Sequence, residues 1–332
     1  MVTTVEHMTS AADLQAPITS HLVSGSAHHK LHLWDAANGA ELVPTNTWKT
    51  GVYAGGTNPV GQTNNAIQVG ADKSTSAHIG NGEVGFFLNG FSTTLKPEQN
   101  YWSMSFGNAP RNSNIMSWSG TNDFHYAYKQ EFKTIYMEDF ACGYSYVGMF
   151  ILDVTTQKVV SVVLADWDSR ISASGGDYAA IAPVQNPDGS LSQVIPFIGG
   201  TLGNSSFVES YGDHYNKGNV AGMIFQRYGT ITRANMQNMI AAFKGLSANA
   251  PHYDTLAAEE LSNNGATPTY LKYLDIAKEL RGFTKMSNNT SDYQVIGIGL
   301  QPELANTKNG LDLVKGQVGL TYKDVVFSTW TN

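Results

Sequence analysis

The stretch Asp166-Trp167-Asp168-Ser169-Arg170 places two carboxylates, an indole ring and a guanidinium at the end of an apolar run. Alternate side chains of a strand share a face, so Asp166 and Asp168 are predicted to lie together. Neighbouring carboxylates separate their pKa values, which suits acid and base catalysis, and such a pair could also bind Ca²⁺. An Asp–Arg pair that closes a loop beside a half-buried Trp explains these residues equally well.

Further ionisable side chains could join this stretch. Glu131 is predicted to share a strand face with His125 and Lys129, although a solvated outer face also accounts for the pattern. His214 lies in a polar loop next to an acid, where the two could act as a base and its orienting group. The residues expected to carry acid and base chemistry are Asp166, Asp168, Glu131 and His125.

Aromatic residues come from neighbouring predicted strands. On a shared concave face they would stack on the apolar faces of sugars. Core packing between two sheets is the alternative, and alternating aromatics on a central strand more often do this. Arg170 would pair with a carboxylate of the protein or of the substrate. The expected substrate-binding residues are Tyr126, Tyr128, Tyr144, Tyr146, Trp167, Arg170 and His214.

Metal and thiol chemistry receive less support. His28, Lys30 and His32 would share one strand face, and a polar strand edge is the favoured interpretation of them. Cys142, the single cysteine, lies in an aromatic run and is predicted to be a small buried hydrophobe. We expect no cofactor and no catalytic metal, while a structural Ca²⁺ at the two aspartates stays open.

The elements that would position these residues are mostly strands. Short apolar segments alternate with turn residues such as Asn81-Gly82 and Pro187-Asp188-Gly189, which is typical of a sandwich. Strands are predicted at 124–132, 144–154 and 159–165. The last two are apolar on both faces, so we place them at the centre of a packed double sheet.

A helical pattern interrupts the strands near residues 230–285. Thr232–Lys244 has apolar residues at helical spacing before Gly245, and Thr267-Pro268 is a cap with proline at the first helical position. Strands resume at 293–300 and 318–327. We therefore expect a polar N-terminal arm at 1–27 and a single β-sandwich domain at 28–332, with the helices as an insert.

Composition excludes some classes of protein. The 332 residues carry a net charge of −7 without a Lys/Arg run, which argues against nucleic-acid binding. No apolar stretch is long enough for a membrane span, and no nucleotide-binding, zincin or α/β-hydrolase motif is present. The first residues do not form a secretory signal. We expect an extracellular or cell-surface protein, with a cytoplasmic or virion location open and the oligomeric state unknown.

The end of the chain resembles a known group. The strand Tyr293-Gln-Val-Ile-Gly-Ile-Gly-Leu-Gln-Pro-Glu303, followed by Val318–Phe327, looks like the closing strands of concanavalin-like jelly rolls. That group includes glucanases, polysaccharide lyases and lectins, so the resemblance implies an antiparallel β-sandwich of the jelly-roll type and a carbohydrate partner. The catalytic motifs of its lyases and of its laminarinase-like glucanases are absent from this sequence, and no catalytic residue is carried over.

The leading functional hypothesis is an enzyme that cleaves a polysaccharide in a cleft on the concave sheet, as a glycoside hydrolase or, second, as a polysaccharide lyase. Two alternatives stay open. One is a lectin or adhesion module that binds carbohydrate without catalysis. The other is a structural protein of a virion or surface layer, for which the polar arm would reach a neighbour.

Overall fold

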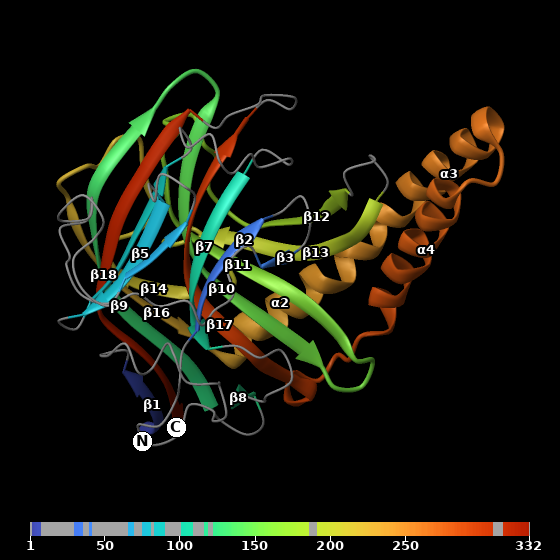
Figure 1. The fold of residues 1–332 in the computed structure, drawn as a ribbon. Coiled ribbons are helices and arrows are strands. Elements are labelled where there is room, and N and C mark those ends of the chain that lie inside the picture. Colours follow the sequence, from blue (N-terminus) through green and yellow to red (C-terminus); the bar gives the residue numbers. More distant parts are fainter. Residues whose placement is uncertain are drawn as a thin grey trace.

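The computed structural model describes residues 2–7, 30–35, 40–41, 66–69, 75–80, 83–89, 101–108, 116–118, 122–185, 191–307 and 315–331. Two β-sheets, A and B, pack face to face, and a helical insert extends from them (Figure 1). The predicted fold class is confirmed as a mostly β, largely antiparallel sandwich with a helical insert.

Sheet A has its longest strands at its centre. In spatial order it contains β14 (Glu209–Gly212), β16 (Ile224–Ile231), β9 (Asn122–Met137), β18 (Gly316–Thr331), β6 (Glu83–Asn89), β5 (Thr75–Gly80) and β4 (Ala66–Val69). In addition, β1 (Val2–His7) pairs with β18. This part of the expected N-terminal arm therefore belongs to the sheet, and residues 8–27 of the arm lie outside the described residues.

Sheet B contains, in spatial order, β12 (Tyr178–Gln185), β13 (Leu191–Thr201), β11 (Lys158–Asp168), β10 (Ala141–Asp153), β17 (Tyr293–Asn306), β7 (Tyr101–Asn108), β2 (Lys30–Asp35) and β3 (Ala40–Glu41). Two short strands join it, since β15 (Asn216–Lys217) pairs with β11 and β8 (Met116–Ser117) pairs with β17. The expected antiparallel arrangement holds except for β11, which runs parallel to β13 and β15.

The alternation of side chains explains how the two sheets meet. On β9, Phe124 and Phe132 are fully buried between the sheets, while Lys129 and Glu131 project outward. On β10, Val147 and its alternate neighbours are buried, and the intervening residues form the face of sheet B that is turned away from sheet A. We call this the outer face of sheet B. The predicted central position of β10 and β11 is confirmed.

The insert begins with α2 (Arg233–Gly245), and the side chain of Thr232 caps its first turn. Then follow η1 (Leu246–Asn249), α3 (Ala250–Asn264), α4 (Pro268–Gly282), η2 (Phe283–Lys285) and η3 (Thr290–Asp292). Phe243 of α2 packs near Tyr293 of β17, with 6.0 Å between ring centroids, so α2 extends the core. The α3–α4 hairpin projects away from the sheets (Figure 1).

Candidate functional site

Asp166 and Asp168 lie on opposite faces of sheet B, so the prediction that they share a face is wrong. The register of β10 against β11 shifts after Ser145, and this bulge lets two consecutive residues, Asp166 and Trp167, both enter the interior. Asp168 pairs with Tyr144 in the next row and projects from the outer face. One Ca²⁺ or one substrate therefore cannot contact both carboxylates.

Asp166 is a fully buried member of an interior polar network. Its Oδ2 accepts a hydrogen bond from the Tyr128 hydroxyl at 2.5 Å, and its Oδ1 accepts from Gln130 at 3.2 Å and from Ser145. These partners come from both sheets, so the carboxylate joins the two layers across the core. All three partners of the carboxylate are themselves buried side chains, so Asp166 has a structural role.

The aromatic residues are divided between two surroundings, which overturns the idea of a single platform. Tyr126, Tyr128 and Trp167 are buried in the core, as the packing alternative predicts. The Trp167 ring lies 4.8 Å from that of Phe132. On the outer face of sheet B, Tyr144 and Tyr146 are partly exposed.

Glu131 and His125 lie on the outer face of sheet A, remote from Asp168. Burial acts to raise the pKa of Glu131, but hydrogen bonds from Lys133 and Lys323 lower it overall. Nδ1 of His125 lies 2.8 Å from the Thr230 hydroxyl. Burial lowers the pKa of His125, although the charge of Asp123 acts to raise it. This is the solvated, ion-paired face that the alternative interpretation predicts.

His214 is exposed, and its ring packs over Gly203. The positive φ of Gly203, 84°, and the 2.5 Å that would separate an added Cβ from the imidazole together favour glycine there. The site residues predicted from sequence are therefore not brought together. Asp168, Arg170, Tyr144 and Tyr146 are the ones that meet on the outer face of sheet B.

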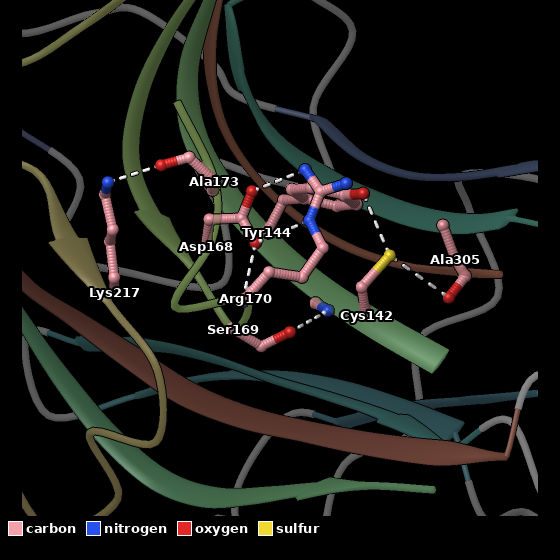
Figure 2. A network of polar contacts seen from close by, with 9 residues as sticks. Cys142, Tyr144, Asp168, Ser169, Arg170, Ala173, Lys217 and Ala305 are labelled. Carbon is pink, nitrogen blue, oxygen red and sulfur yellow. Dashed lines mark hydrogen bonds and ion pairs between the residues drawn. The ribbon is translucent and has the colours of Figure 1, made fainter. Parts of the chain in front are cut away.

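Asp168 is held in place by Arg170 (Figure 2). Its Oδ1 accepts hydrogen bonds from the backbone N–H and Nε of Arg170 at 2.8 and 3.1 Å, and its Oδ2 accepts from Nη2 at 2.7 Å. Tyr215 lies close enough to Asp168 that burial, together with the charge of Asp168, raises the Tyr215 pKa. Of the two roles expected for Arg170, the structure shows the pairing with a protein carboxylate.

The ring of Tyr144 lies under the Arg170 guanidinium, with 5.0 Å from Cζ to the ring centroid. The Tyr144 hydroxyl meets Sγ of Cys142 at 2.9 Å (Figure 2). Cys142 is buried, and burial raises the pKa of its thiol, in agreement with the predicted buried hydrophobe. One face of the Tyr144 ring is thus covered by Arg170.

Glu303 is the functional candidate that the sequence reasoning missed. It pairs with Tyr144 on the side opposite Asp168, so the three residues form one row across β11, β10 and β17. Its Oε2 accepts a hydrogen bond from the Tyr146 hydroxyl at 3.0 Å. Burial raises the pKa of Glu303 to about 7, although this hydrogen bond acts to lower it. The alternation Gly297, Gly299, Gln301, Glu303 against buried Ile and Leu could have placed it on the outer face.

A second row of the same face is rich in glycine. From β12 to β7 it contains Tyr178, Gly199, Val163, Gly148, Gly299 and Gly107. The Tyr178 ring occupies the space above Gly199, where an added Cβ would lie 2.2 Å from its Cζ. A Cβ on Gly148 would lie 3.6 Å from the Tyr146 ring. Gly199 therefore lets the Tyr178 ring lie low against the sheet, whereas the distance at Gly148 is an ordinary van der Waals contact.

The described residues contain no group of three or more His, Cys, Asp and Glu side chains arranged to hold a metal ion. None of the helices in the described ranges has the length and apolar character that crossing a membrane requires.

No protein-family model and no curated protein matches the chain. Among solved structures, the family 11 xylanase of Neocallimastix patriciarum and a loop-swap mutant of it each match with a TM-score of 0.35 and 10% sequence identity. Each match covers 80% of this chain and 100% of the xylanase. The likeness is weak and concerns the fold only, so the site has to be interpreted from its own geometry.

Proposed function

We propose that this protein is a carbohydrate-active enzyme that hydrolyses a polysaccharide bound across the outer face of sheet B. The observation that carries the proposal is the Glu303 carboxyl, whose pKa is raised to about 7 by burial. A glycosidase needs one carboxylic acid that stays protonated near neutral pH to donate a proton to the leaving sugar oxygen. Glu303 is proposed as this general acid, with Tyr146 orienting its carboxyl.

Asp168 is proposed as the second carboxylate. Asp168 and Glu303 flank Tyr144 on the two adjacent strands, so their backbone positions lie two strand spacings, about 9–10 Å, apart. Inverting glycosidases separate their carboxyl groups by roughly 6.5–9.5 Å to admit a water molecule, whereas retaining enzymes use about 5 Å. This backbone spacing leaves room for the wider carboxyl separation, and Asp168 is proposed as the base of an inverting reaction.

The glycine-rich row supplies the place for the substrate. It runs across the strands parallel to the row of carboxylates, and the row that contains Tyr146 and Gln301 lies between the two. The ring of Tyr178, which is 42% exposed, lies at one end of it. Sugar rings stack on such low-lying aromatic faces, and the missing side chains let a chain of sugars approach the backbone. A polysaccharide substrate is consistent with an extracellular location, which is part of this proposal.

A carbohydrate-binding protein without catalysis is the second candidate. It is favoured by the three hydrogen bonds that Asp168 already accepts from Arg170, because a general base needs a free oxygen for water. The row of carboxylates would then serve to bind sugar hydroxyls.

The deciding experiment incubates the purified protein with a panel of neutral and acidic polysaccharides and measures reducing ends, anomeric configuration and unsaturated products. The proposal expects reducing ends with inverted configuration, and a loss of at least about 100-fold in Glu303→Gln. Glu259→Gln, an exposed glutamate of α3, is the matched control and should retain activity. Binding without any products supports the second candidate, and unsaturated products would indicate a lyase.

A further inference from the structure

Arg227 is a fully buried arginine of β16 that faces the interior of the sandwich. Its Nε donates to Oε1 of Gln130 at 2.9 Å. Its Nη1 donates to two consecutive backbone carbonyls, those of Asp213 at 3.3 Å and of His214. A guanidinium can serve these three acceptors at once because its donors are fixed in a plane.

The charge of Arg227 has a counter-charge within the core. Gln130 accepts from Arg227 and donates to Asp166, so the amide links a buried cation to a buried carboxylate. A buried ion costs several kcal/mol unless it is compensated, so Arg227 is retained at a cost that simple packing would avoid. We therefore looked to the neighbours of Arg227 for a role beyond packing in the core.

The two carbonyls that Arg227 binds lie immediately before Tyr215. From there the chain forms β15, which pairs with Trp167 and Asp168 of β11. Two backbone hydrogen bonds fasten this segment, from the Tyr215 N–H to the Leu202 carbonyl at 3.0 Å and from the Gly218 N–H to the Asp168 carbonyl at 2.9 Å. From the core side, Arg227 anchors this segment at residues 213–214, and the buried Trp167 indole N–H anchors it at the Gly218 carbonyl at 2.9 Å.

We propose that Arg227 is a positioning residue for Asp168. It fixes the turn at residues 213–214 and thereby keeps Tyr215 close to the Asp168 carboxylate on the far side of sheet B. The inference rests on the proposed function for the role of Asp168, but the mechanical link itself does not. The interior network and the outer face of sheet B are thereby one connected arrangement rather than two.

The link is tested by amide hydrogen exchange in Arg227→Lys, which keeps the charge and loses the planar set of donors. We expect the Tyr215 and Gly218 amides to exchange at least tenfold faster, with the Met149 amide of β10 unchanged. Arg281→Lys, an exposed arginine of α4, is the matched control and should leave all three unchanged. Unchanged exchange at Tyr215 and Gly218 in folded Arg227→Lys overturns the proposal.

The consequence for catalysis is tested by a double-mutant cycle with Tyr215→Phe, read as kcat and KM on the polysaccharide that the wild type cleaves. If Arg227 acts through Tyr215, the two kcat losses are not additive, and the double variant resembles Tyr215→Phe alone. Additive losses contradict the proposal. A wild type that cleaves no polysaccharide refutes the proposed function instead, and the exchange measurement still decides the link.

Should Arg227→Lys fail to fold, the variant Arg227→Met with Asp166→Asn replaces it, since removing both charges leaves neither buried and unpaired. It is expected to give the same faster exchange at Tyr215 and Gly218. Protection equal to wild type in this variant also counts against the proposal.

Discussion

The hydroxyl of Tyr146 donates a hydrogen bond to Oε2 of Glu303 at 3.0 Å, across the pair of strands β10 and β17. The two opposing influences on Glu303 are thus separable by substitution. Burial raises the pKa of Glu303, and the hydrogen bond from the Tyr146 hydroxyl acts to lower it. The substitution Tyr146→Phe removes that hydroxyl alone.

The first prediction concerns the pH dependence of catalysis. If protonated Glu303 is the acid, kcat/KM falls as the pH rises through about 7. In Tyr146→Phe the hydrogen bond to the charged carboxylate is lost, so the falling limb moves to higher pH. Tyr211→Phe, which removes an exposed hydroxyl on sheet A, is the control and leaves the limb in place. A limb that moves to lower pH in Tyr146→Phe would contradict this role for Tyr146.

The second prediction concerns stability and holds whether or not the protein is an enzyme. The folded pKa of Glu303, about 7, lies above the ordinary 4.5, so the folded state retains a proton that the unfolded state releases. The free energy of unfolding therefore falls between about pH 4.5 and 7. The difference in the free energy of unfolding between Glu303→Gln and wild type should therefore be more favourable to the variant at pH 8 than at pH 4, by on the order of 1–3 kcal/mol. Urea unfolding at both pH values measures this, and an equal difference at the two would refute it.

The third prediction tests the interior network. Asp166→Ala leaves Arg227 buried without its nearby carboxylate, so we expect a loss of about 3–5 kcal/mol in the free energy of unfolding. Asp254→Ala removes one partner of the exposed Asp254–Arg281 pair and should cost about 0–1 kcal/mol. Chemical denaturation of the two variants makes the comparison. Equal small effects would mean that Asp166 does not compensate a buried charge.

The fourth prediction tests the glycine-rich row. In Gly199→Ala the new methyl group would collide with the Tyr178 ring and displace it. If that ring stacks on a sugar, binding weakens about twofold to tenfold, because a stacking contact contributes about 0.5–1.5 kcal/mol. Gly245→Ala, which has open space around the new methyl group, is the control. Calorimetric titration with oligosaccharides gives both dissociation constants, and unchanged binding in folded Gly199→Ala removes Tyr178 from the site.

Alternation along the sequence predicted much of the fold. The buried row Phe124, Tyr126, Tyr128 follows directly from a period of two, and so does the outward position of Glu131. The helical spacing over Thr232–Lys244 likewise predicted α2, and the Thr267 cap marked the start of α4. These features depend on neighbours in sequence, which is why one sequence is enough to find them.

The site depended on information that lies between strands. The bulge opposite Ser145 places Asp166 and Asp168 on opposite faces of sheet B. Residues 158–168 alone do not predict it, because it arises from the register of β11 against β10. Glu303 can be identified as a candidate site residue only from its pairing with Tyr144 and from the burial that raises its pKa. The apolar residues of α4 show that helical spacing alone does not fix burial, since Ala277 and Leu280 are buried while Leu271 and Leu274 are exposed.

The order of strands in sheet A has a consequence for biosynthesis. β18 lies between β9 and β6, so it joins the β14–β16–β9 part of the sheet to the β6–β5–β4 part. It is synthesised after both of them, and until it emerges from the ribosome the edges of β9 and β6 that it joins have no partner. We therefore expect the two parts of sheet A to join only once β18 has been made, and a chain shortened before β18 to expose two adhesive strand edges and aggregate.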